Sequence, residues 1–147
     1  MIEARNYQSG DVRKLKPRDI YGAEADIFDR TDFLGTSTNS VAYTLVDSKT
    51  SEVIAIVGMT MLWQGVADLW AVTSDLVDQY PLAFVRKCRK LLKVFFTHAG
   101  IHRWNTYVRC DFVKGHKFTK SLGFEFECKL RKFGPDGSDF YFFSRVA

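Results

Sequence analysis

Cysteine is scarce in this sequence, and its spacing excludes two common uses. The chain contains three cysteines, Cys88, Cys110 and Cys128, and none of them belongs to a CxxC pair. An odd, widely spaced set favours neither a disulfide framework nor a zinc site. We therefore expect a reducing, cytoplasmic environment and no bound metal.

Long apolar runs and polar low-complexity stretches are both missing. No apolar run reaches the roughly 18 residues that a membrane-spanning helix needs, and the N-terminus lacks the pattern of a signal peptide. Hydrophobic residues make up 46% of the chain and charged residues 26%, a balance typical of a globular protein with a buried core. The 147 residues suit one core and are too few for two ordinary domains. We expect a single domain over residues 1–147, with no membrane anchor.

The charge balance is mildly basic. There are 21 Lys and Arg residues against 17 Asp and Glu, which gives a net charge of +4. Many of the basic residues gather in two segments, 86–93 and 114–132. A phosphate-bearing ligand, a nucleic acid or a solvated basic face would each account for them. No known nucleic-acid-binding motif accompanies these residues, so we do not expect nucleic acid as a partner.

Alternating and continuous apolar patterns predict seven strands. The predicted strands span residues 2–5, 41–46, 52–62, 66–72, 103–108, 124–130 and 139–143. Turn-forming residues separate them, most strongly at Gly134-Pro135-Asp136-Gly137. We therefore expect a hairpin to close the fold.

Helical patterns fall between several of these strands. Residues 12–33 are broken at Pro17 and suggest two helical pieces, the second near residues 20–28. Pro81 suits the first turn of a longer helix, which Gly100 would end. The residues expected to face the core from that helix are Leu82, Val85, Cys88, Leu92 and Phe95 or Phe96.

A strand, the long helix and another strand follow one another over residues 66–108. A crossover of this kind joins parallel strands. A shorter helix is expected over residues 112–121, with Asp111 as its N-cap and Gly123 in the left-handed conformation after its end. We therefore predict an α/β (α+β) fold, in which a mostly antiparallel twisted sheet has a central parallel strand pair and flanking helices.

Two segments resemble the GCN5-related N-acetyltransferase (GNAT) family, and the order of elements is similar to that family over essentially the whole chain. The family's F-Y-x-x-x-G-F signature, a helix that ends at glycine before an aromatic residue, resembles residues 118–124, Phe118-Thr119-Lys120-Ser121-Leu122-Gly123-Phe124. The family's acetyl-CoA segment resembles the strand Leu69-Trp70-Ala71-Val72 and the loop after it. The resemblance implies a GNAT-type acetyltransferase that transfers the acetyl group of acetyl-CoA to an amine.

The resemblance also implies a coenzyme site at the start of the long helix. The family usually has Q/R-x-x-G-x-G/A there, because glycines let backbone N–H groups approach the pyrophosphate. The matching register is Gln79-Tyr80-Pro81-Leu82-Ala83-Phe84, a degenerate motif with Leu82 and Phe84 where the family has small residues. The residues with implied coenzyme contacts are Ala71, Val72 and Thr73 through their backbone, Gln79, Leu82, Ala83 and Phe84 in the motif, and Arg86 and Lys87 on the helix.

Candidate catalytic residues follow from the same resemblance. Asp68 lies on the strand where family members often carry a carboxylate that deprotonates the amine through water, although a solvent-facing strand carboxylate is the simpler reading. The family's usual acid is a tyrosine, and this chain has Thr119 at that position, whose hydroxyl is too weak an acid to replace it. Tyr107 and His116 are the candidate substitutes, and His116 also fits a solvated surface residue among lysines.

Three functions therefore stay open. The first is an acetyltransferase acting on a small-molecule or protein amine. The second is a non-catalytic GNAT-fold protein that binds a phage or host protein, in the host cytoplasm or in a virion. Its basis is a resemblance of residues 72–75 and 86–91 to GNAT-like internal virion or assembly proteins of podoviruses. The third is a nucleic-acid-binding α/β module, suggested by basic residues interleaved with Phe and Trp.

Overall fold

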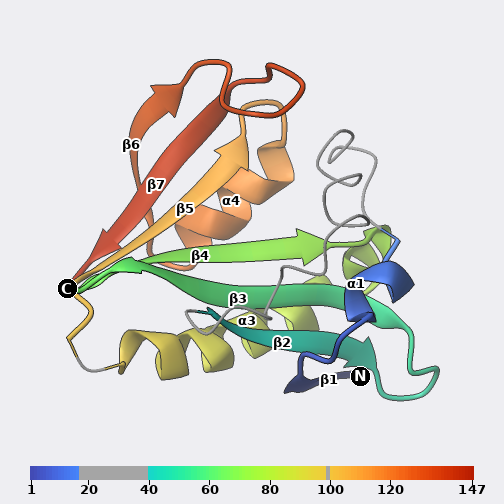
Figure 1. The fold of residues 1–147 in the computed structure, drawn as a ribbon. Coiled ribbons are helices and arrows are strands. Elements are labelled where there is room, and N and C mark those ends of the chain that lie inside the picture. The colour runs from blue at the N-terminus through green and yellow to red at the C-terminus, as the bar shows by residue number, and fades with distance from the viewer. Residues whose placement is uncertain (17–39, 99) are drawn as a thin grey trace.

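A twisted seven-stranded sheet forms the centre of the fold (Figure 1). The computed structural model describes residues 1–16, 40–98 and 100–147. Most of the region predicted to hold two helical pieces, including residues 20–28, lies outside these ranges. Within them, no helix is long and apolar enough to cross a membrane. The same ranges contain no group of three or more His, Cys, Asp and Glu side chains that could hold a metal ion.

The strands lie in the order β1-β2-β3-β4-β5-β7-β6. Their bounds are β1 (Ile2–Asn6), β2 (Ser40–Asp47), β3 (Val53–Trp63), β4 (Val66–Thr73), β5 (Arg103–Arg109), β6 (Glu125–Leu130) and β7 (Phe140–Val146). Neighbouring strands pair antiparallel except β4 and β5, which pair parallel. The predicted mixed sheet, its central parallel pair and the closing hairpin of β6 and β7 are confirmed.

β4 and β5 stay together only at their first residues. Residues 66–68 of β4 pair with residues 103–105 of β5. Beyond this point the described residues pair β4 only with β3, and β5 only with β7. Figure 1 shows the two halves of the sheet diverging from there. The fold therefore has an opening between its two central strands.

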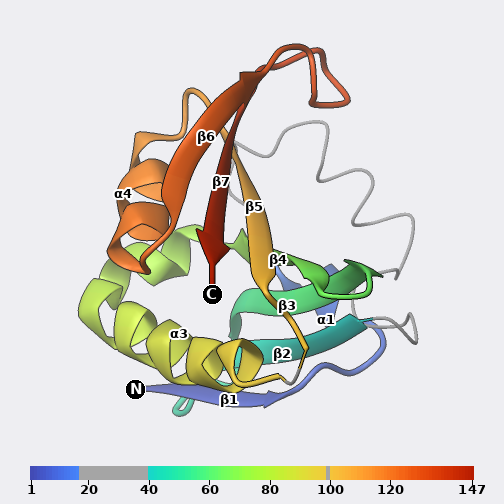
Figure 2. The ribbon, with the colours of Figure 1, turned by 90° about the vertical axis from the view of Figure 1, so that its left-hand side faces the viewer.

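Helices cover both faces of the sheet (Figure 2). α3 (Pro81–Phe96) and α4 (Val113–Ser121) lie on one face, and the short 3-10 helix η2 (Asp75–Gln79) leads into α3. α1 (Asp11–Lys14) lies on the opposite face. The opening between β4 and β5 is thus flanked by α3 and α4 on one side.

The residues of β3 divide between two buried clusters, because successive strand residues point to opposite faces. Ala55 and Val57 pack in the cluster that contains Phe84 of α3. Ile56 packs in a cluster with Val12 of α1. Both faces of the sheet are therefore apolar in its N-terminal half.

α3 begins at Pro81 as predicted, but its first turn puts a different residue into the core. Phe84 is 3% exposed, whereas Leu82 is 70% exposed. The prediction that Leu82 faces the core is therefore wrong. An α-helix turns by about 100° per residue, so Leu82 lies about 120° around the helix from buried Cys88, and Phe84 only about 40°.

The predicted helix ends are partly confirmed. α3 stops at the Thr97 cap, before Gly100, whose φ of +85° falls in the link to β5. Gly123 has a φ of +90° after α4, as predicted. Asp111 is not the N-cap of α4, which is Phe112 with no side-chain cap. The helix begins at Val113, one residue later than predicted, so Asp111 lies one residue before the cap, and its carboxylate accepts a hydrogen bond from Arg109 Nε at 3.3 Å.

Candidate functional site

A cavity of about 630 Å³ occupies the opening between β4 and β5. Its walls come from both strands and from η2, α3 and α4. Thr106 and Tyr107 of β5 both line it, although neighbouring strand residues point to opposite faces. The cavity therefore reaches from the face covered by α3 and α4 to the opposite face. Its volume falls in the range of ligand pockets, roughly 300–1,000 Å³.

The wall on the helix side is apolar and aromatic. Phe84 of α3 and Phe118 of α4 stack there with their ring centroids 5.2 Å apart. Cys88 also lines this wall, and burial raises the pKa of its thiol to about 12. A thiol with that pKa stays protonated at neutral pH, so Cys88 is unsuited to act as a nucleophile.

The backbone of β4 faces the opening at Ala71. The N–H of Ser74 donates to the carbonyl of Ile54 on β3, and Ser74 lies opposite Ile54 in the antiparallel register. Backbone groups alternate in direction along a strand, so those of Val72 also point to β3 and those of Ala71 point to the β5 side. In the described chain β5 pairs with β4 only as far as Asp68. A bound molecule with an amide can therefore pair with Ala71 as another strand would.

A polar cluster lies where the two strands part. Asp68 Oδ1 accepts hydrogen bonds from the Nδ2 of Asn105 and the hydroxyl of Tyr107, both at 3.3 Å. Burial raises the pKa of Asp68, although both hydrogen bonds lower it. Tyr107 lines the cavity, whereas Asp68 does not line it and is linked to it through its hydrogen bond with Tyr107. The structure thus brings together two residues that the sequence proposed separately for proton transfer.

Tyr107 is held between aromatic rings. Its ring stacks on Phe133 at a centroid distance of 5.1 Å and lies 5.1 Å from Phe142, the residue opposite it on β7. Burial, followed by the nearby charge of Asp68, raises the pKa of Tyr107 to about 12. The phenol is therefore protonated at neutral pH and acts as a hydrogen-bond donor.

His116 lies apart from this cluster. Its Nε2 is 2.8 Å from the backbone oxygen of Arg109, and its ring lies 4.9 Å from that of Tyr141. It is half-buried against these groups, unlike a solvated surface residue, and it is not among the described residues that line the cavity. The structure does not bring His116 to Asp68.

The residues predicted to contact a coenzyme fall into two groups. Ala71, Thr73 and Phe84 line the cavity. The others do not: Val72 is buried on the opposite face, Gln79, Leu82 and Arg86 are exposed, and Ala83 and Lys87 are half-buried on α3. The first turn of α3 nevertheless meets the cavity, because Pro81 lines it.

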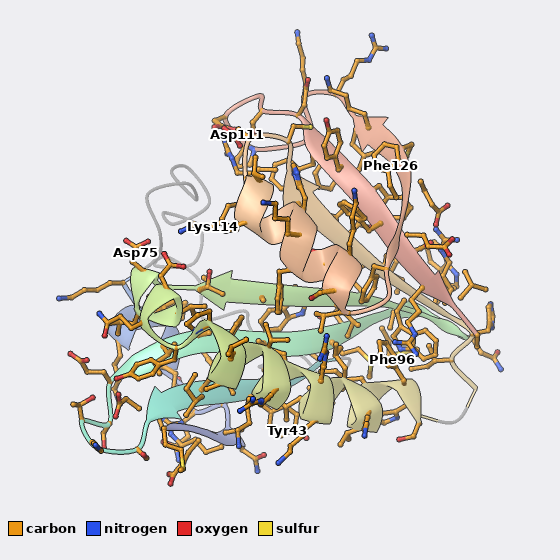
Figure 3. All side chains as sticks on the ribbon, turned by 180° about the vertical axis from the view of Figure 1, so that it is seen from behind. Tyr43, Asp75, Phe96, Asp111, Lys114 and Phe126 are labelled. Carbon is orange, nitrogen blue, oxygen red and sulfur yellow. The ribbon has the colours of Figure 1, made fainter. Side chains whose placement is uncertain are left out.

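Two lysines of α4 meet the cavity in places that the sequence did not predict. Lys114 and Lys117 both line it, and they share one face of α4 because they are three residues apart. Lys114 reaches from α4 toward η2 (Figure 3), where its Nζ lies 3.1 Å from Asp78 Oδ2. The basic segment that holds them was visible in the sequence, but the side of α4 that faces α3 was not.

Three solved structures that share this fold are named as acetyltransferases. A protein assigned as a phosphinothricin N-acetyltransferase has a TM-score of 0.76 at 13% identity, with 99% of this chain and 98% of that chain covered. A GNAT-family acetyltransferase from Bacillus anthracis has a TM-score of 0.72 at 12% identity, with 99% and 94% covered. A variant of the spermidine N-acetyltransferase SpeG from Vibrio cholerae has a TM-score of 0.69 at 13% identity, with 99% and 93% covered.

Sequence comparison adds nothing to this likeness, because no protein-family model and no curated protein matches the chain. At 12–13% identity the solved structures establish the fold alone. The chain therefore has the GNAT fold that its sequence resemblance implied.

Proposed function

We propose that this chain is a GNAT-type N-acetyltransferase that transfers the acetyl group of acetyl-CoA to an amine. The observation that carries the proposal is the pair of Asp68 and Tyr107, which share a 3.3 Å hydrogen bond at the point where β4 and β5 part. The cavity in that opening would hold the thioester next to this pair. The fold shared with N-acetyltransferases supports the same reading.

The residues around the cavity fit acetyl-CoA. The backbone of Ala71 points to the opening and would pair with the amide-containing arm of the coenzyme. The N–H groups of Leu82 and Ala83 lie in the first turn of α3, where a helix favours phosphate, while Pro81 contributes no N–H. Of the two bulky residues in the degenerate motif, Leu82 is exposed and is not among the residues that line the cavity, and Phe84 lines it packed on Phe118.

Lysines at the cavity would neutralise the coenzyme phosphates. Lys114 and Lys117 line the cavity, whereas Arg86 and Lys87 do not. We therefore assign this role first to the α4 lysines and treat Arg86 and Lys87 as more distant contributors to the positive field.

Asp68 would act as the base. An alkylammonium acceptor first loses a proton to Asp68, directly or through a water, and the raised pKa of Asp68 makes the carboxylate a better proton acceptor. The free amine nitrogen then bonds to the thioester carbonyl carbon as the C–S bond breaks. The second amine proton passes to the departing sulfur, which yields the acetamide and the free thiol. Asp68 returns its proton to solvent.

Tyr107 would position Asp68 rather than protonate the sulfur. Its pKa of about 12 lies well above the ordinary thiol value of about 8.5, so a full proton transfer from Tyr107 to the thiolate is unfavourable. Its hydroxyl would orient the carboxylate through the one hydrogen bond that a phenol can donate.

Calorimetric titration with acetyl-CoA and with coenzyme A, at low and at moderate salt, tests the proposal. Saturable binding that survives moderate salt is expected, followed by thiol release when amines are added. Adenosine 3′,5′-bisphosphate is the control, since it carries phosphates without the thioester arm. Acetyl-CoA binding that equals the control, or that disappears with salt, would exclude the coenzyme site. Spermidine belongs in the first amine panel, because the SpeG neighbour is a spermidine N-acetyltransferase.

The alternative is a non-catalytic GNAT-fold protein that binds a protein partner, as in virion assembly. Two observations favour it: Pro81 removes one N–H donor from the first turn of α3, and Thr119 stands where the family has its tyrosine. The comparisons with solved structures give the phage role no support. Absence of coenzyme binding in the titration would leave this alternative as the better reading.

A further inference from the structure

On the sheet face opposite α3 and α4, aromatic side chains of β4, β5 and β7 line the cavity, and one of them, Tyr107, donates to the Asp68 carboxylate. Trp70 follows Asp68 on the same face of β4, where its ring lies over Gly58 and its indole N–H donates to Thr60 Oγ1 at 2.9 Å. Tyr107 donates to Asp68 from β5. Trp70, Tyr107 and Phe140 all line the cavity. Phe133 extends this wall, stacked on Tyr107 and 5.3 Å from Phe140. We call Trp70, Tyr107, Phe133 and Phe140 the aromatic wall.

On this face of the sheet, Asp68 is the charged group that would attract one cation. Arg109 lines the cavity, but its guanidinium already contacts Asp111 at 3.3 Å and Asp136 at 3.2 Å. Arg103 contacts Glu127. Asp68, by contrast, is bonded by the neutral groups of Asn105 and Tyr107. Among the described residues around the wall, Asp68 is thus the carboxylate held only by neutral donors.

These features match a particular kind of amine. Aromatic rings bind flat apolar groups by stacking and bind ammonium groups over their faces. A second positive charge on the acceptor would instead lie near the positive charge of Arg103 or Arg109. The carboxylates beside these two arginines already form ion pairs with them.

We propose that the acceptor is a primary amine with a single positive charge on an aromatic or other flat apolar body, bound with its nitrogen toward Asp68 and its body on the aromatic wall. This inference rests on the proposed acetyltransferase function and names its substrate class. Phe133 is then a specificity-determining residue, since its ring covers Tyr107 and is still 51% exposed.

Acetyl transfer to phenethylamine, n-butylamine and spermidine provides the test. The proposal expects kcat/KM for phenethylamine to exceed that for either other amine by about tenfold or more, in line with the stacking of one ring. Phe133→Ala should raise the KM for phenethylamine severalfold and leave the KM for acetyl-CoA unchanged. Phe126→Ala is the matched control, because Phe126 is 50% exposed and packs on Tyr141 and Phe143, away from Tyr107.

Ligand-observed NMR of phenethylamine with the protein separates this inference from the function that it rests on. If phenethylamine binds, binds more weakly to Phe133→Ala and is not acetylated, the amine site is supported and the acetyltransferase function is excluded. If turnover is faster with spermidine, or if Phe133→Ala and Phe126→Ala change turnover equally, the inferred substrate class is wrong but the acetyltransferase function stands. Absence of both binding and turnover would overturn both.

Discussion

The hydroxyl of Tyr107 donates a 3.3 Å hydrogen bond to Asp68 across the last paired position of β4 and β5. Because the two strands separate directly afterwards, this contact lies beside the opening, and Tyr107 lines the cavity there. Parallel register brings the two side chains together, although they are 39 residues apart in the chain.

Asp68→Asn should lower kcat by about 100-fold or more, the usual contribution of a general base, while acetyl-CoA affinity stays the same. The carboxylate must be ionised to accept a proton, so wild-type activity should rise with pH through the raised pKa of Asp68. The variant should lack that rising limb. Turnover against pH, with calorimetry of acetyl-CoA binding, measures both effects. Unchanged turnover would reduce Asp68 to a structural carboxylate.

Tyr107→Phe should shift the same rising part of the pH–activity profile to higher pH. The Tyr107 hydroxyl lowers the pKa of Asp68 by hydrogen bonding to its ionised form, so removing the hydroxyl raises that pKa further. We expect a loss in kcat of about tenfold, smaller than for Asp68→Asn, since a hydrogen bond to a charged group is worth roughly 1.5 kcal/mol or somewhat more. A limb that stays in place would mean that the hydrogen bond does not form in solution.

Local sequence patterns predicted the strands, the parallel pair and the closing hairpin, because alternation, turns and crossover connections are short-range signals. The same patterns placed Leu82 in the core instead of Phe84, since a three-to-four residue spacing fits both until the neighbouring layer is known. Asp68 and Tyr107 were both named from the sequence. That they touch depends on strand register, which no local pattern contains.

The cavity itself could not be read from the sequence. It exists because β4 and β5 stop pairing after residues 68 and 105, which is a property of the whole sheet. Its lysines illustrate the difficulty: Lys114 and Lys117 belong to a visible basic segment, but only the packing of α4 beside η2 and α3 shows which side chains meet the cavity.

Lys117→Ala should weaken acetyl-CoA binding by about fivefold at low salt, as expected for one partly exposed charge contact worth roughly 1 kcal/mol. The loss should shrink as salt rises, and it should vanish for a short acetyl thioester that lacks phosphates. Lys120→Ala is the matched control, because Lys120 is exposed on the same helix and does not line the cavity. Equal losses of acetyl-CoA affinity in the two variants would mean that α4 acts through its overall positive charge and not through a contact of Lys117 with the coenzyme.

Arg5→Ala tests a second charged pair, far from the cavity. Asp11 is fully buried, and its Oδ2 accepts hydrogen bonds from Arg5 Nη1 and the Thr44 hydroxyl, each at 2.7 Å. Removing the guanidinium leaves the buried carboxylate with the weaker ion pair to Lys14, whose Nζ lies 4.0 Å from Asp11 Oδ1. We expect a loss of roughly 2–3 kcal/mol in the free energy of unfolding, below the usual range for a buried pair because Arg5 is partly exposed. Arg13→Ala is the control, since Arg13 is exposed on α1 and should change this free energy by less than about 0.5 kcal/mol.

The pH dependence of stability separates the Asp11 charge from simple packing. Burial opposes ionisation of Asp11, but the hydrogen bonds from Arg5, Gln8 and Thr44 together hold its pKa below the ordinary 3.8. A lowered pKa means that the stabilisation is present above the ordinary pKa and is lost as the pH falls through the folded value. Denaturant unfolding at pH 7 and near pH 3 should therefore show wild type losing more free energy of unfolding than Asp11→Asn, which has no charge to lose there. Equal losses in the two proteins would assign the acid sensitivity to other carboxylates with lowered pKa values, such as Asp136 and Asp139.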